Sequence, residues 1–78
     1  MSGFTLTSLA VGQRAVITDI SAEADVRQRM QSMGLRSGRE ACIVRAAALG
    51  GPIQVRVGSV TLILRRCDAA RVRVSLCA

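Results

Sequence analysis

The feature that most restricts the fold of this chain is an alternation of apolar and polar residues near its C-terminal end. Between residues 53 and 64, two such runs flank Gly58-Ser59, and a two-residue connection of this kind is typical of a tight β-hairpin. A slip of one residue would turn the apolar face to water, so the register is well specified. The predicted pairs are Ile53 with Leu64, Val55 with Leu62, and Val57 with Val60.

Three further segments have the composition of strands. Residues 14–20 are rich in Ala, Val, Ile and Thr, residues 40–46 form a second run, and residues 71–76 alternate again. β-branched residues and period-two alternation favour strands that are half buried. In the last segment the side chains predicted to point inward are those of Val72, Val74 and Leu76.

Five short strands and one helix predict a mainly β fold, a small SH3-like antiparallel barrel with a short helical insertion at about residues 22–34. A ferredoxin-like β-α-β unit is the alternative, but the chain has only one clear helix. We interpret residues 1–78 as a single domain, because its length suits one modest core. The predicted connections are an entry segment at residues 5–12, a turn at Ser37-Gly38 and a loop at Leu49-Gly50-Gly51-Pro52.

Polar residues mark the start of the helix, which we expect over residues 22–33. Ser21 is a candidate N-cap, and Glu23 and Asp25 follow in the first turn, where acidic side chains suit the helix dipole. Asp25 and Arg29 are four residues apart, so an ion pair between them is expected to add a few tenths of a kcal/mol, roughly.

The end of the same helix carries a clear stop signal. Val26, Met30 and Met33 follow one another at helical spacing and form one apolar stripe. Gly34 then occupies the position after the last helical residue, where glycine adopts a left-handed conformation at little cost. Leu35 follows, and a Schellman ending predicts that it packs back on Met30.

Charge and cysteine content limit the compartment and the partners. The net charge is +6 and all eleven basic residues are arginine, which favours acidic partners, although a solvated arginine-rich surface is the simpler interpretation. The cysteines are odd in number and far apart, which is typical of a reducing compartment. No signal peptide or run of ~20 apolar residues occurs, so we expect a cytoplasmic protein. Cys42, Cys67 and Cys77 are the three cysteines, and the first two are candidate core residues.

Several classes of function are disfavoured by the residues that the chain lacks. Without histidine, the commonest general base and metal ligand is missing, and the cysteines do not have the spacing of a zinc site. We therefore expect no enzyme activity, no small-molecule substrate, no cofactor and no dedicated metal site. Phe4 is the only aromatic residue, so neither base stacking nor a proline-peptide groove lined by aromatic residues is expected.

The order and spacing of four short motifs resemble the FeoA family, the small cytoplasmic component of the bacterial Feo ferrous-iron transport system, over nearly the whole chain. The resemblance implies an SH3-like barrel with a helical insertion, a role with the iron-importing membrane protein FeoB, which carries a cytoplasmic GTP-binding domain, and transition-metal binding at family level. This chain has Gly50-Gly51-Pro52 where the family usually has Gly-Asp-Pro. The motifs are Leu6-x-x-Leu9-x-x-Gly12, Arg29-Met-x-x-Met-Gly-Leu-x-x-Gly38, Gly51-Pro-Ile-x-Val55, and Leu64-Arg65 followed by Ala69.

On this resemblance the expected function is that of an accessory protein that binds and modulates FeoB, and reaches the membrane only through FeoB. Methionine adapts well to binding surfaces, which favours the helix and its adjoining loop as the interface. Ordinary packing against the barrel is the competing interpretation for Met30. The candidate partner-binding residues are Arg27, Arg29, Met30, Met33, Gly34, Leu35 and Leu49.

The alternative function is that of a basic SH3-like domain related to the C-terminal domain of iron-dependent repressors, which binds nucleic acid or another protein. Nucleic-acid binding would have to be electrostatic, and it would weaken steeply with salt. A free strand edge at residues 53–57 is also expected to be able to pair with a second copy. The arginines available for the electrostatic mode are Arg45, Arg56, Arg65, Arg66, Arg71 and Arg73.

Overall fold

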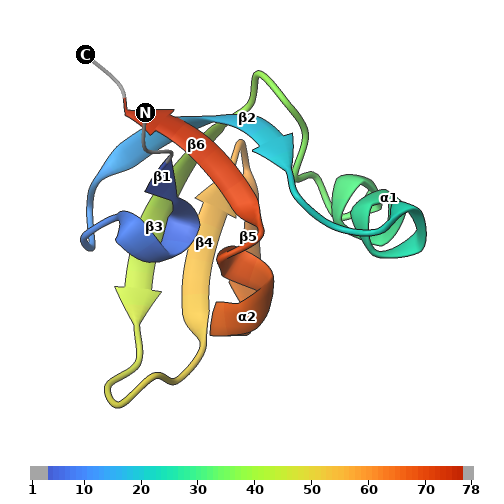
Figure 1. Cartoon of the computed structure of the whole chain (residues 1–78). Helices are drawn as coiled ribbons and strands as arrows, with labels where there is room; N and C mark the ends of the chain where they lie inside the picture. The colour runs from blue at the N-terminus through green and yellow to red at the C-terminus, as the bar shows by residue number, and fades with distance from the viewer. Residues whose placement is uncertain (1–3, 77–78) are drawn as a thin grey trace.

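A single, strongly bent antiparallel sheet forms most of the molecule (Figure 1). The computed structural model describes residues 4–76. The sheet has six strands in the order β1-β6-β2-β3-β4-β5. The elements are β1 (Phe4–Thr5), the 3-10 helix η1 (Leu6–Ser8), β2 (Arg14–Ile20), α1 (Ala24–Ser32), β3 (Glu40–Ala46), β4 (Ile53–Val57), β5 (Val60–Leu64), α2 (Arg66–Ala69) and β6 (Val72–Leu76).

The β4–β5 hairpin has the register that the alternation predicts. Val57 pairs with Val60, and Ile53 pairs with Leu64 at the far end of the hairpin. The turn is possible because Gly58 has a φ of +63°, a conformation that side chains disfavour. The bounds of β2 and β3 also agree with the predicted strands, and β6 begins at Val72, one residue later than expected.

One strand was not predicted. β1 has only two residues, and it pairs with β6 through Phe4 opposite Val74 and Thr5 opposite Arg73. Two residues are too few to show a period-two pattern, so the sequence predicts five strands where the sheet has six. The predicted entry segment also contains η1, whose Leu6 is fully buried, and it ends in a turn at residues 11–12.

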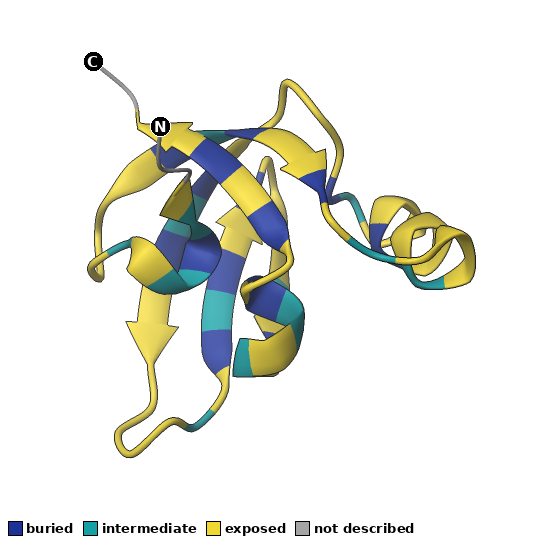
Figure 2. Cartoon of the chain, in the orientation of Figure 1, coloured by how far each residue is buried: buried dark blue, intermediate teal, exposed yellow. Residues whose placement is uncertain are grey.

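The core is aliphatic and lies inside the curve of the sheet. Buried residues alternate with half-buried or exposed ones along β4 and along the first four residues of β6 (Figure 2). Leu76 is 41% exposed, so its predicted inward position is wrong. Cys67 is exposed and Cys42 half buried, so Cys67 is not a core residue, and Cys77 lies outside the described residues. The largest fully buried side chains are those of Leu6, Ile17, Leu35, Ile43, Val55 and Val72.

α1 begins later than predicted. Its N-cap is Glu23 rather than Ser21, because the N–H of Ser21 donates to the carbonyl of Arg71 at 2.7 Å and keeps this residue tied to the sheet. The predicted pair of Asp25 with Arg29 is also wrong, since no ion pair joins them within the described residues. The carboxylate of Asp25 instead accepts a hydrogen bond from the N–H of Val26 at 2.9 Å.

The end of α1 is the predicted Schellman motif. The N–H of Leu35 donates to the carbonyl of Met30 at 3.2 Å, and the N–H of Gly34 donates to that of Gln31 at 3.0 Å. Gly34 has a φ of +110°. Met30 and Leu35 are 2% and 0% exposed and belong to the core, so the helix is joined to the sheet at this turn.

The free edges of the sheet differ from the prediction. Residues 53–57 form β4, which is paired on one side with β3, for example Val55 with Ile43, and on the other with β5. β4 is therefore an interior strand, and the predicted free edge there is wrong. The terminal strands in the sheet order are β1 and β5.

None of the helices in the described part of the chain is long and apolar enough to cross a membrane.

We predict that Gly34→Val lowers the free energy of unfolding by about 1–3 kcal/mol, because a β-branched residue is strained at this φ. No atom lies within 4 Å of a Cβ built on Gly34, so the loss would come from the backbone rather than from a clash. Urea denaturation measures it. Gln31→Val, at an exposed position of the same helix, is the control and should cost about 0.5 kcal/mol. Equal losses in the two variants would contradict the strain argument.

Candidate partner-binding surface

α1 is an exposed helix attached to the sheet along a narrow face. Figure 2 shows it almost wholly exposed, apart from one buried band. Met30 is its buried residue, and Val26 is half buried. Arg27 and Arg29 are exposed, and Met33, the C-cap residue, is 39% exposed.

The predicted partner-binding residues on this insertion therefore fall into two groups. Arg27, Arg29 and Met33 present surface to solvent. Met30 and Leu35 are core residues, and Gly34 supplies the positive φ between them. The burial of Met30 agrees with the interpretation that this side chain packs against the barrel.

A groove separates α1 from β5 and α2. Its volume is about 230 Å³, and we call it the helix groove. Apolar side chains from both walls line it, together with an ion pair in which Nε of Arg65 lies 3.3 Å from Oδ2 of Asp68. The lining residues are Val26, Arg29, Met30, Met33, Ile63, Leu64, Arg65 and Asp68.

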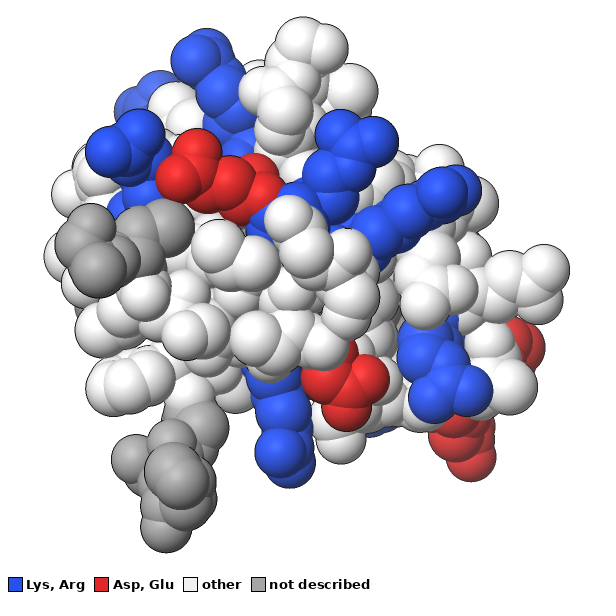
Figure 3. All heavy atoms as spheres, turned by 90° about the horizontal axis from the view of Figure 1, so that it is seen from above, with Lys and Arg blue, Asp and Glu red and all other residues white. Residues whose placement is uncertain are grey.

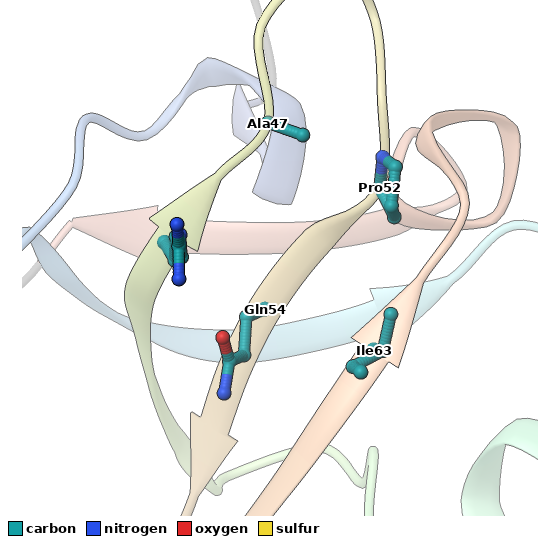
Figure 4. Close-up of a pocket in the computed structure, with 5 residues that line it drawn as sticks. Ala47, Pro52, Gln54 and Ile63 are labelled. Atoms are coloured by element: carbon teal, nitrogen blue, oxygen red, sulfur yellow. The ribbon is translucent and has the colours of Figure 1, made fainter.

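A second hollow, of about 260 Å³, lies on the outer face of β3, β4 and β5, and we call it the outer groove. In Figure 4 the side chains of Ala47, Pro52, Gln54 and Ile63 are placed around it on neighbouring segments. Gln54 pairs with Ile63 on one side and with Arg45 on the other, so these three residues form one row across the strands.

Ile63 lines both grooves, and the sequence prediction did not include it. Its side chain is 73% exposed. The sequence did contain a signal for this residue. Ile63 belongs to the same outward-facing set of the alternation as Thr61 and Arg65, and it is the large apolar residue among them. Alternation identified the outward face correctly, but only the fold places α1 opposite this residue.

Leu49 lies on a different part of the molecule from α1. It is fully exposed, at 104%, and has a φ of +59° in the β3–β4 loop. Figure 1 shows this loop and α1 at separate ends of the fold. Nη2 of Arg66 donates to the carbonyl of Ala47 at 3.1 Å, so α2 holds the base of the loop.

The arginines of the electrostatic alternative are divided among several surfaces. Arg45 lines the outer groove and Arg65 the helix groove, while Arg56 lines a polar cleft of about 390 Å³ that also contains Arg14. Figure 3 shows arginines with acidic side chains between them on the face seen from above. These observations do not combine the six arginines into one surface.

Residues 4–76 contain no group of three or more cysteine, aspartate or glutamate side chains placed to hold a metal ion.

A family model and a relative aligned over most of this chain point to the same family. A family model described as the FeoA domain matches residues 4–76. The chain is 34% identical over 71 residues to the Fe(2+) transport protein A/Fe(2+) transporter FeoB fusion protein of Porphyromonas gingivalis. That match covers 91% of this chain but only 8% of the fusion protein.

Solved structures resemble the whole fold. The FeoA protein of Chlorobium tepidum is 36% identical, with a TM-score of 0.88, over 96% of this chain and 71% of that one. A FeoA of Stenotrophomonas maltophilia, solved with zinc and described as a prokaryotic SH3 domain protein, is 30% identical, with a TM-score of 0.76, over 92% of this chain and 89% of its own. The predicted SH3-like fold is thereby confirmed.

We predict that Arg66→Ala lowers the free energy of unfolding by about 1 kcal/mol, since it removes the hydrogen bond to Ala47. Amide exchange of Ala47 and Gly51 in the β3–β4 loop should become faster, and NMR measures both amides. Arg65→Ala is the control, because its exposed ion pair should contribute no more than about 0.5 kcal/mol. Unchanged exchange in Arg66→Ala would contradict an anchoring role.

Proposed function

Because the chain belongs to the FeoA family, we propose that it is an accessory protein of ferrous-iron uptake that binds and modulates the transporter FeoB. FeoA proteins are non-enzymatic accessory proteins, in agreement with the predicted absence of enzyme activity. The proposed location is the cytoplasm, with membrane contact only through FeoB.

The relative from Porphyromonas gingivalis supports FeoB as the partner. In that protein an iron transport protein A and FeoB are parts of one chain. Fusion gives the two parts a high effective concentration for each other. We propose that this chain makes the corresponding contact as a separate protein.

The proposed interface is centred on the exposed side of α1 and the adjoining helix groove. Met33 and Ile63 expose apolar surface on opposite walls of this groove, and exposed apolar patches of this kind are typical of protein contacts. Arg27 and Arg29 would meet acidic groups of FeoB at the rim, where charges mainly set orientation and association rate.

The remaining predicted residues have other roles in this proposal. Met30, Gly34 and Leu35 would hold α1 in position, because the first and last are buried and the glycine makes the turn. Leu49 would be a second contact at the β3–β4 loop. A partner that touches both α1 and this loop would have to extend across the outer face of the sheet.

The test is an NMR titration of the labelled protein with the purified cytoplasmic GTP-binding domain of FeoB, at moderate and at high salt. Salt-resistant shifts at residues 27–38 and at Ile63 would support the proposal. Shifts that disappear at high salt and recur with short DNA would favour the nucleic-acid alternative. If neither this domain nor full-length FeoB in detergent produced shifts, the proposal would be wrong.

We predict that Met33→Glu weakens FeoB binding about tenfold or more, since it places a charge in an apolar contact. Its effect on the free energy of unfolding should stay within about 0.5 kcal/mol, because the side chain is partly exposed. Calorimetry with FeoB and urea denaturation measure the two quantities. Val11→Glu, at a 60% exposed apolar position in the turn before β2, is the matched control. Equal weakening in both variants would contradict the proposed location of the interface.

A further inference from the structure

β5 is the free edge of the sheet with the greater length. It has five residues, whereas β1 at the other edge has two. Such an edge is a template for another strand, and proteins usually protect it with charged residues or proline. Residues 60–64 contain neither. β5 therefore has neither of these two protections.

The register of the hairpin identifies which backbone groups are free. Val57 and Val60 flank the two-residue turn and form a hydrogen-bonded pair, and such pairs alternate along an antiparallel ladder. Thr61 and Ile63 fall on the alternate positions, so their N–H and C=O groups point away from β4. No hydrogen bond joins these groups to another described residue outside the ladder.

The helix groove lies beside this edge. Ile63 and Leu64 of β5 form one wall, and Val26 and Met33 of α1 belong to the other. A strand paired with β5 would lie about 4.8 Å from it, on the side of the groove. Its side chains would then contact the apolar surface of α1.

The charges around the groove indicate which kind of segment would bind beside β5. Arg29 lies on the α1 wall and Arg65 at the end of β5, and Asp68 is already paired with Arg65. Since that pair is neutral as a unit, Arg29 leaves the groove lining with one net positive charge, which would attract an acidic segment. A second copy of this chain, with a net charge of +6, would bring its own Arg29 and Arg65 close to these arginines, and like charges at contact distance are unfavourable.

We propose that β5 accepts an extended acidic segment of a partner protein as a seventh strand, in the groove between β5 and α1. Backbone hydrogen bonds to Thr61 and Ile63 would supply affinity, and contacts with Met33 and Arg29 would supply selectivity. The proposal deepens the proposed function, which it uses only for the identity of the partner, FeoB.

Amide hydrogen exchange of the whole labelled chain, followed by NMR, tests the strand acceptor directly. The probe is a synthetic peptide of alternating glutamate and valine, and a peptide of alternating lysine and valine is its control. We expect the glutamate peptide to slow exchange at the amides of Thr61 and Ile63 about tenfold or more, since these become hydrogen-bonded. The lysine peptide should leave both amides unprotected.

A matched pair of variants tests the selectivity. Arg29→Glu should weaken binding of the glutamate peptide about fivefold, whereas Arg73→Glu, an equal change of charge on β6, should leave it unchanged. Absence of protection at both amides at millimolar glutamate peptide would overturn the proposal. So would protection that develops with protein concentration alone, because β5 would then pair with a second copy.

The same exchange measurement with the cytoplasmic domain of FeoB separates the two proposals. Binding of that domain without protection at Thr61 and Ile63 would refute strand addition and leave the proposed function intact. Protection by the glutamate peptide, with no binding of FeoB, would refute the proposed partner and leave the strand acceptor intact.

Discussion

The turn that ends α1 determines where the candidate surface lies. A helix of nine residues is too short to be stable alone in water, and α1 contributes only Met30 as a buried residue. Leu35, just beyond the helix, adds a second buried side chain, and the positive φ of Gly34 brings the two together. Because this turn joins α1 to the core, it also holds the outer side of the helix opposite β5.

The second constraint is the register of the β4–β5 hairpin. One register buries Ile53, Val55 and Val57, and it also decides that the side chain of Ile63 points outward. The same pairing directs the free backbone groups of Thr61 and Ile63 to the edge. The register of this one hairpin therefore determines both which side chains are buried in the core and which groups are exposed at the candidate site.

The sequence predicted those parts of the fold that depend on neighbours along the chain. Alternation around Gly58-Ser59 predicted the hairpin, residue composition predicted the bounds of β2 and β3, and the stop signal at Gly34 predicted the Schellman turn. The N-cap was missed because Ser21 bonds to the distant Arg71. The free edge was placed on β4 rather than β5, because strand order depends on the whole sheet and no local pattern records it.

The candidate site was harder to predict for the same reason. Arg29 and Met33 were recognised on α1, but Ile63 joins them only because β5 follows the edge of the sheet beside the helix. A guest in this groove would touch β5 on one side and α1 on the other. Few buried residues hold α1 to the sheet. A segment bound in the groove would add contacts that form only when α1 is folded and in its place beside β5. By linkage, partner binding would therefore stabilise the position of α1.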